Sequence, residues 1–354
     1  MLLGAIEVGS FFYLKSNGEK PQLFYASSNP EDRIREAFMR KGNKLGAEFW
    51  AVDPLLGHAY DGTEEYVKTL TRDAYFSKGF VTYAKKGEKL ERPVIVTLGG
   101  STTDGILFGH SWPEELAKVL KSQTLKGTVV NGGTGAYSTN QELLKLIRDG
   151  LEFEPDIVIS YSGINDRGYY NELPHPMVSK YQKDFFNGFL NRSAGSKPFP
   201  IFPSTVQLLN SLFKSKNSEN LSLTLGVEST STVGHYYKKN VEIMHSASTS
   251  QGAKYYSFIQ PFALYKSKHS AIVPRGYYPE KAIEESDALY EEIQKLPATH
   301  DYVFDISSVL EKEEDVYQID GAHLKQKGDA VIAKVIFGYV ENQVRQLQAG
   351  GTKP

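Results

Sequence analysis

Five short apolar runs and five amphipathic stretches alternate along the chain from about residue 93 to its end. The apolar runs cover residues 94–98, 128–130, 156–161, 254–259 and 302–306. The first is continuously apolar and stops at Gly99 and Gly100, which is typical of a strand buried on both faces. We therefore predict five strands in the C-terminal two-thirds of the chain.

Helical patterns fill the spaces between these strands, at residues 112–120, 138–151, 233–251, 279–296 and 325–348. In the second, Leu143, Leu144, Ile147 and Leu151 predict the apolar face. Strands that alternate with helices favour a parallel sheet covered on both faces. Sites in such sheets lie at the carboxyl ends of the strands.

Two regions depart from this alternation. Residues 15–90 show no clear period, so we interpret residues 1–90 as an irregular N-terminal subdomain preceding a catalytic domain at 91–348. Residues 166–231 are rich in Asn, Ser, Pro and Phe, and we expect them to form an insertion or lid in that domain. Residues 1–14 are apolar except for Glu7, and two interpretations remain open. They are a buried strand or helix, or the stub of a membrane anchor.

The composition is that of an ordinary globular protein, with 354 residues, 40% hydrophobic residues and a net charge of -2. Forty basic residues against 42 acidic ones give no overall attraction to nucleic acid. The absence of cysteine excludes disulfides, thiolate nucleophiles and cysteine-based metal sites. His175, His235 and His245 have no metal-ligand spacing with a third partner, so we interpret them as structural or surface residues.

Polar residues stand at the ends of the predicted strands, and together they suggest acyl-transfer chemistry. Ser101 is the candidate nucleophile and His323 the base that such a hydroxyl needs. Asp320 is placed to orient the imidazole. The Asn165 amide, with backbone N–H groups of Ser101 and the 131–136 loop, would stabilise an oxyanion.

Four motifs resemble those of the SGNH/GDSL hydrolase family, in the family's order. They are Gly99-Gly-Ser101-Thr-Thr103, Asn131-Gly-Gly-Thr-Gly-Ala136-Tyr137, Gly163-Ile-Asn165-Asp166 and Asp320-Gly-Ala-His323. Gly100 stands where the family has Asp. The family's oxyanion glycine falls on Ala136, with Gly135 one place earlier, so the backbone N–H of either residue is a candidate donor.

The resemblance implies a three-layer α/β/α fold of flavodoxin type with a five-stranded parallel sheet. It also implies ester hydrolysis or acyl transfer without metal or cofactor. Residues 53–57 look like a segment of membrane-anchored bacterial members that act on envelope polysaccharides. That likeness favours the anchor interpretation and an extracytoplasmic location, in the periplasm or cell envelope, with the cytoplasm as the alternative.

We therefore expect a serine esterase that removes O-acetyl groups from a bacterial polysaccharide. An O-acetyltransferase using the same serine and histidine is one alternative, and a non-catalytic polysaccharide-binding protein is another. Asp166, Arg167, Tyr169 and Tyr170 follow the third motif and are candidate substrate-binding residues. For Arg167, contact with an acidic substrate and pairing with a carboxylate of the protein remain equal alternatives.

Overall fold

The computed structural model describes residues 13, 16, 50–53, 55–60, 74–167, 233–265, 272–274, 277–278 and 280–350. The chain divides into two compact units, Met1–His58 with Tyr181–Leu225, and Ala59–Lys180 with Gly226–Pro354. Tyr169, Tyr170 and almost all of the predicted insertion and anchor segment lie outside the described residues. No helix among those described is long and apolar enough to cross a membrane.

The region before residue 74 contains one small sheet among its described residues. Strand β1 (Trp50–Asp53) pairs with β2 (Gly57–Tyr60). The carboxylate of Asp53 accepts the backbone N–H groups of Leu55 and Leu56, at 2.9 and 2.8 Å. Such a bond from an aspartate to the backbone ahead of it favours a turn.

The second unit contains a seven-stranded sheet in the order β3-β4-β6-β5-β7-β8-β9. The last five of these are parallel and correspond to the predicted strands. They are β5 (Val94–Gly99), β6 (Thr128–Asn131), β7 (Ile157–Ser162), β8 (Lys254–Ile259) and β9 (Val303–Asp305). Numbered along the chain, their spatial order is 2-1-3-4-5, which confirms the predicted flavodoxin-type arrangement.

Two further strands extend the sheet, so the expectation of five strands was too small. Strand β3 (Tyr75–Ser77) and β4 (Phe80–Thr82) form a hairpin, and β4 pairs antiparallel with β6. The two turn residues, Lys78 and Gly79, have φ of 52° and 79°, as a two-residue hairpin turn requires. This hairpin belongs to the seven-stranded sheet, although the sequence analysis grouped residues 75–82 with the N-terminal subdomain.

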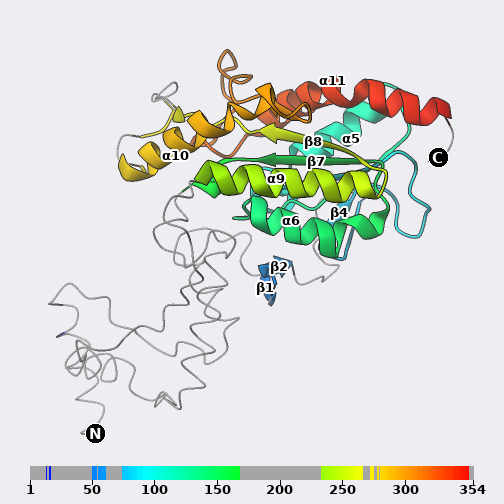
Figure 1. Ribbon diagram of the computed structural model, residues 1–354, viewed down its shortest axis with the longest axis horizontal. Coiled ribbons are helices and arrows are strands. Elements are labelled where there is room, and N and C mark those ends of the chain that lie inside the picture. The colour runs from blue at the N-terminus through cyan, green and yellow to red at the C-terminus, as the bar shows by residue number, and fades with distance from the viewer. Residues whose placement is uncertain are drawn as a thin grey trace, which may run out of the picture. The chain divides into compact units, whose positions relative to one another are not determined.

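Helices cover both faces of this sheet. Helices α5 (Trp112–Ser122) and α11 (Gln326–Gly350) pack together, and α6 (Thr139–Arg148), α9 (Val233–Ser250) and α10 (Glu280–Ile293) form the other layer (Figure 1). Short helical turns are α4 (Gly105–Phe108), η3 (Gly150–Phe153), η4 (Ile164–Asp166) and η6 (Leu296–Ala298). The three-layer prediction is therefore confirmed.

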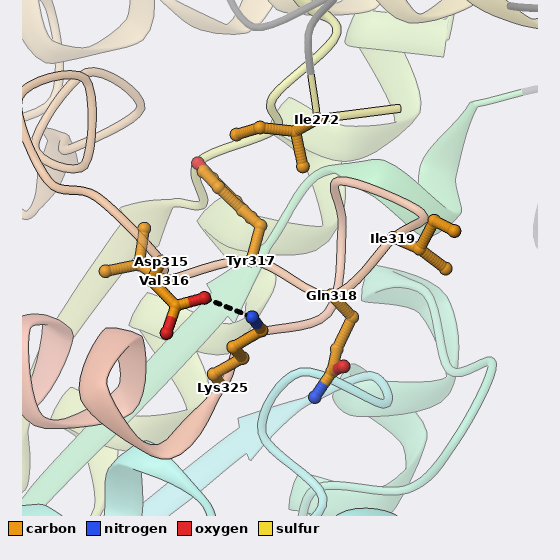
Figure 2. A pocket seen from close by; sticks show the side chains of 7 residues that line it. All are labelled: Ile272, Asp315, Val316, Tyr317, Gln318, Ile319 and Lys325. Carbon is orange, nitrogen blue, oxygen red and sulfur yellow. Dashed lines mark hydrogen bonds and ion pairs between the residues drawn. The ribbon is translucent and has the colours of Figure 1, made fainter. Parts of the chain in front are cut away.

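The segment between β9 and α11 forms a tight hairpin. Tyr317 and Leu324 form an isolated antiparallel bridge, and the Gln318 N–H donates to the His323 carbonyl at 2.8 Å. The hairpin borders an open cavity of about 490 Å³, in which an ion pair joins Asp315 to Lys325 (Figure 2). Its lining residues are Ile272, Asp315, Val316, Tyr317, Gln318, Ile319 and Lys325. The hairpin thus holds the backbone of residues 317–324, which include Asp320 and His323, in a defined geometry.

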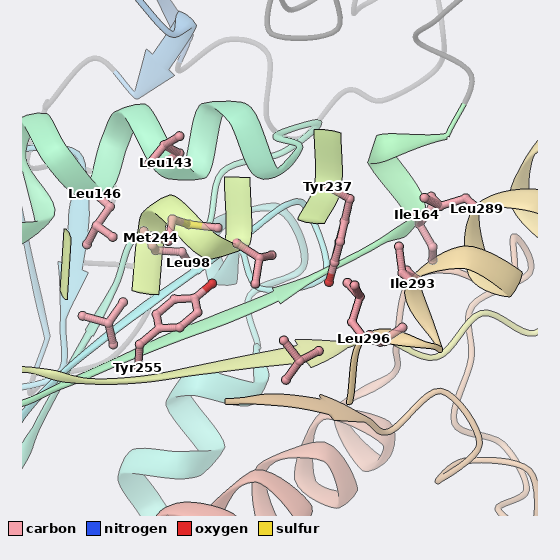
Figure 3. Packing of buried hydrophobic residues seen from close by; sticks show 14 of the residues in the cluster. Leu98, Leu143, Leu146, Ile164, Tyr237, Met244, Tyr255, Leu289, Ile293 and Leu296 are labelled. Carbon is pink, nitrogen blue, oxygen red and sulfur yellow. The ribbon is translucent and has the colours of Figure 1, made fainter. Parts of the chain in front are cut away.

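Two apolar clusters, one on each face of the sheet, hold the strands in place. Val94, Val96 and Leu98 of β5 enter one cluster and Ile95 enters the other, as the alternation of a strand requires. Figure 3 shows part of the first cluster, where Leu98 at the end of β5 and Ile164 of η4 both belong to the buried set. The core therefore fixes the ends of β5 and β7, after which Ser101 and Asn165 follow.

Helix α6 differs from the prediction in the face that it buries. Ile147, expected in the apolar stripe, is exposed, whereas Leu143 and Leu146 are buried. Glu142 and Lys145 are buried with them, because both find polar partners inside the protein. A helix face that includes paired polar groups cannot be located from apolar residues alone.

Candidate active site

The candidate nucleophile lies where the order of the strands reverses. Strand β5 ends at Gly99 and is followed by Ser101, and the adjacent β7 ends at Ser162 and is followed by Asn165. Since β6 lies on the other side of β5, the loops after β5 and β7 diverge at this point. Open α/β sheets bind ligands in the crevice formed there.

Ser101 and His323, which are 222 positions apart, are in hydrogen-bond contact. The Ser101 Oγ lies 2.7 Å from the His323 Nε2. The histidine comes from the hairpin before α11, and its side chain is 22% exposed. The pair therefore has the geometry of a hydroxyl beside its base and is accessible from solvent.

Asp320 completes the chain of contacts. Its Oδ2 lies 2.5 Å from the Nδ1 of His323, and its Oδ1 accepts the N–H groups of Ala322 and His323 at 2.9 Å each. Burial alone would raise the pKa of Asp320, but the hydrogen bond and charge of His323 outweigh it and lower the pKa. The carboxylate thus stays ionised and orients the imidazole.

Phe108 packs directly on the histidine, a contact that the sequence analysis did not anticipate. Its ring centre lies 4.8 Å from that of His323, and its side chain is 40% exposed at the end of α4. Aromatic pairs at this separation attract one another beyond their burial. Phe108 therefore restrains the imidazole while remaining exposed itself.

Gly135 and Ala136, the two candidate backbone donors to the oxyanion, have different contacts in the loop after β6. The Gly135 N–H donates to the carboxylate of Asp104 at 2.9 Å. Ala136 has φ of 64°, a left-handed conformation that costs a non-glycine residue about 1–2 kcal/mol. Among the described residues, the N–H groups of Ala136 and Ser101 have no hydrogen-bond partner. The geometry therefore favours Ala136 over Gly135 as a donor.

Asp104 holds this loop and is a site residue that sequence reasoning missed. It is buried and accepts hydrogen bonds from the Tyr60 hydroxyl and from the backbone N–H groups of Ile106 and Gly135. Burial raises the pKa of Asp104 to about 6, although these hydrogen bonds oppose the shift. Its position three residues after Ser101, at the N-cap of α4, was the available signal.

Asn165 approaches the serine loop closely. Its Nδ2 donates to the Tyr137 carbonyl at 2.9 Å, which leaves the second N–H of the amide for another acceptor. A Cβ atom on Gly100 would lie 2.4 Å from this nitrogen. The glycine that replaces the family's Asp therefore makes room for Asn165.

Asp166 binds to the start of α6 through one of its oxygens, and its role as a substrate contact stays a prediction. Its Oδ1 accepts the Thr139 N–H at 3.1 Å and the Thr139 hydroxyl at 2.6 Å, and burial raises its pKa to about 7. Nearby, the buried Glu142 accepts the hydroxyls of Ser160 and Ser162, at 2.7 and 2.5 Å. Asp166 thus connects the third motif to the start of α6.

Arg167 does not pair with a carboxylate in the part of the chain that the structure describes. Its Nη1 donates to the Ser286 hydroxyl at 3.0 Å, and its guanidinium packs against the rings of Phe262 and Tyr278. Of the two interpretations of Arg167, pairing with an acidic group of the protein has no support among these residues. No group of three or more potential metal ligands occurs among the described residues.

Comparison with solved structures finds several esterases at low sequence identity. The lipase/acylhydrolase from Enterococcus faecalis is 16% identical, with a TM-score of 0.39, over 74% of this chain and 98% of that chain. The acetyl xylan esterase AlAXEase is 14% identical, with a TM-score of 0.41, over 70% of this chain and 99% of that chain. No curated protein matches the sequence.

A comparison with family models identifies the family. The sequence model described as GDSL-like Lipase/Acylhydrolase matches residues 95–336, which is more than half of the chain. This range begins in β5 and ends in α11, and it contains Ser101, Asn165, Asp320 and His323. The chain therefore belongs to the GDSL-like lipase/acylhydrolase family.

Proposed function

We propose that this protein is a serine esterase that removes O-acetyl groups from a polysaccharide through an acyl-serine intermediate. The observation that carries the proposal is the continuous chain of contacts from the Ser101 Oγ through both nitrogens of His323 to the Asp320 carboxylate. Such a chain supplies a nucleophile, a base and a group that fixes the tautomer of the base.

In the first half of the reaction, the Ser101 Oγ forms a bond to the ester carbonyl carbon while its proton passes to the Nε2 of His323. The electron pair of the carbonyl moves onto its oxygen. The N–H groups of Ser101 and Ala136 and the Asn165 amide are the donors for this oxyanion. The Asp320 carboxylate stabilises the imidazolium that forms.

In the second half, the carbonyl reforms and the bond to the sugar oxygen breaks, with His323 returning its proton to that oxygen. Water then attacks the acyl-serine and loses a proton to His323. Breakdown of this second tetrahedral intermediate releases acetic acid and restores the Ser101 hydroxyl. All proton transfers pass through one imidazole, which acts as base and as acid in turn.

A polymer-bound acetyl group as substrate is supported by the accessibility of the site. The His323 and Asp320 side chains are 22% and 17% exposed, and Phe108 beside them is also partly exposed. An ester that projects from a long chain can reach such a site without the polymer having to enter the protein. An envelope polysaccharide would place the enzyme outside the cytoplasm, which cell fractionation tests.

The experiment combines a chemical probe with turnover. A fluorophosphonate should label wild-type protein at Ser101, as peptide mapping would establish, and should not label Ser101→Ala. Acetate release from acetylated polysaccharide and hydrolysis of p-nitrophenyl acetate should both vanish in Ser101→Ala and His323→Ala, with unchanged melting temperatures. Turnover that survives in Ser101→Ala would refute the proposal. Acetyl transfer to an unmodified polysaccharide would indicate a transferase, and glycan binding without turnover would indicate a binding protein.

A further inference from the structure

Arg167 lies in a corner formed by two aromatic rings. Its guanidinium carbon is 4.9 Å from the ring centre of Phe262 and 4.7 Å from that of Tyr278. The two rings are nearly perpendicular, at 79°, with centres 6.0 Å apart. The Ser286 hydroxyl accepts one N–H from Nη1 at 3.0 Å. The cation is therefore held in a fixed orientation rather than extended freely into solvent.

Arg167 has hydrogen-bond donors that its contacts within the protein do not use. A guanidinium carries five N–H donors in a planar fork, and the fork matches a carboxylate through two parallel hydrogen bonds. A partly buried cation normally has an acidic partner, because withdrawing charge from water is costly. In the described ranges, the contacts of Arg167 are with Ser286, Phe262 and Tyr278, and no ion pair with a carboxylate is among them. The remaining donors of the fork are available to an acidic group from outside the described residues.

The aromatic corner adjoins the catalytic residues. Arg167 follows Asn165 by two positions, on the turn that also carries the amide donor. Ala263, next to Phe262, donates its N–H to the Gly321 carbonyl at 2.8 Å, immediately after Asp320. A group bound by Arg167 would therefore lie on the same side of the site as Asn165 and the hairpin that carries Asp320.

An exposed tyrosine beside the corner offers a surface for a sugar ring. Tyr277 is 49% exposed, and its ring centre lies 5.1 Å from that of Tyr278. A flat aromatic face can stack on the apolar face of a sugar while the arginine binds an acidic substituent of it. The two features together match a sugar that carries a carboxylate.

We propose that Arg167 binds the carboxylate of a uronic acid, so that the substrate is an O-acetylated acidic polysaccharide. This inference rests on the proposed esterase function for the reaction, although binding itself does not depend on it. Arg167 contributes affinity and orientation for the sugar, and Ser101 and His323 act on the acetyl group in the same way for charged and neutral substrates.

Kinetics with charged and neutral esters test this assignment. In Arg167→Gln, kcat/KM for O-acetylated polygalacturonate should fall about 10- to 100-fold, mainly through KM, as expected for losing a charge-assisted hydrogen-bonded pair. Hydrolysis of p-nitrophenyl acetate and acetylated xylan should stay within about 2-fold of wild type. Arg167→Lys, which keeps the charge but not the fork, should fall in between. Arg345→Gln, at an exposed ion pair on α11, is the matched control, and it should leave kcat/KM for both the charged and the neutral esters unchanged.

Binding without turnover separates this inference from the esterase function. Calorimetry, carried out below the melting temperature of each protein, should show that oligogalacturonate binds to wild type and Ser101→Ala, and binds about 10- to 100-fold more weakly to Arg167→Gln. If no acetyl ester is cleaved but this difference persists, the esterase proposal fails and the binding site stands. The assigned site would be wrong if Arg167→Gln lost activity equally on charged and neutral esters, or if it bound oligogalacturonate as tightly as wild type does. It would also be wrong if wild type bound dextran sulfate as tightly as oligogalacturonate.

Discussion

Gly100 and Asn165 fit together so closely that a Cβ atom on residue 100 would lie 2.4 Å from the Asn165 Nδ2. The Tyr137 carbonyl, which accepts from that amide, would be 2.9 Å from the same Cβ. Real Cβ contacts are longer than either distance, so any side chain at residue 100 must displace the amide. The shape of the serine loop thus sets the position of an oxyanion donor that comes from another strand.

Gly100→Ala should therefore behave like the loss of an oxyanion donor. We expect kcat for p-nitrophenyl acetate to fall about 10²–10³-fold, as in Asn165→Ala, because the amide is pushed from its place. Steady-state kinetics and thermal melting check this. Gly338→Ala is the matched control, since a Cβ there meets nothing within 4 Å, and it should leave kcat unchanged. An active Gly100→Ala would mean that Asn165 is not a donor.

Asp320→Asn should separate the two tasks of this carboxylate. One oxygen serves two backbone N–H groups and the other serves the imidazole, whereas an amide has a single acceptor oxygen. We expect kcat to fall on the order of 10³–10⁴-fold through the wrong imidazole tautomer. Asp305→Asn, at an exposed turn that accepts the Ser307 N–H, should retain activity. Full activity of Asp320→Asn would show that the carboxylate acts only as a cap.

Phe108→Ala should release the imidazole from its aromatic neighbour. An aromatic pair contributes about 0.5–1.5 kcal/mol, so we expect kcat to fall about 2- to 10-fold with a small change in melting temperature. Tyr339→Ala provides the comparison, because Tyr339 is similarly exposed and packs on Phe258 and Phe304 away from the histidine. The prediction fails if both variants have the same kcat.

The buried Glu142 should make stability depend on pH. Burial, aided by the nearby charge of Asp166, raises its pKa to about 8, although hydrogen bonds from Ser162 and Ser160 oppose the shift. The unfolded chain loses this proton near its ordinary pKa, whereas the folded chain keeps it until about pH 8. Stability from this group is therefore complete at low pH and declines as pH rises toward 8.

Glu142→Gln should flatten that decline. Urea unfolding at pH 5, 6, 7 and 8 should give a smaller loss of unfolding free energy with rising pH than in wild type. Glu341→Gln, at an exposed pair with Arg345, should keep the wild-type slope. Identical slopes in all three proteins would contradict the raised pKa.

The sequence was sufficient for the parallel strands because each is a short apolar run that ends in small or polar residues. It was also sufficient to select Ser101, Asn165, Asp320 and His323, since strand ends converge at one edge of such a sheet. The structure brings all four side chains to that edge, as the contacts of Ser101, His323 and Asp320 and the approach of Asn165 to Gly100 show.

Partners from distant segments account for what the sequence did not predict. Lys145 is buried because Gly79 and Thr134 accept its N–H groups, both at 2.9 Å, and Glu142 is buried because two serines of β7 donate to it. The hairpin of β3 and β4 is too short to show a period, and its turn depends on a lysine in the left-handed region. Asp166 faces inward because Thr139 meets it there.

The hairpin of β3 and β4 also bears on how the catalytic part can be produced alone. The Gly79 carbonyl accepts from Lys145, whose other bond supports Thr134, and the Tyr60 hydroxyl donates to the carboxylate that fixes Gly135. A version trimmed to start at residue 91 would lose both supports at once. Shortened proteins for crystallisation should therefore begin before Tyr60.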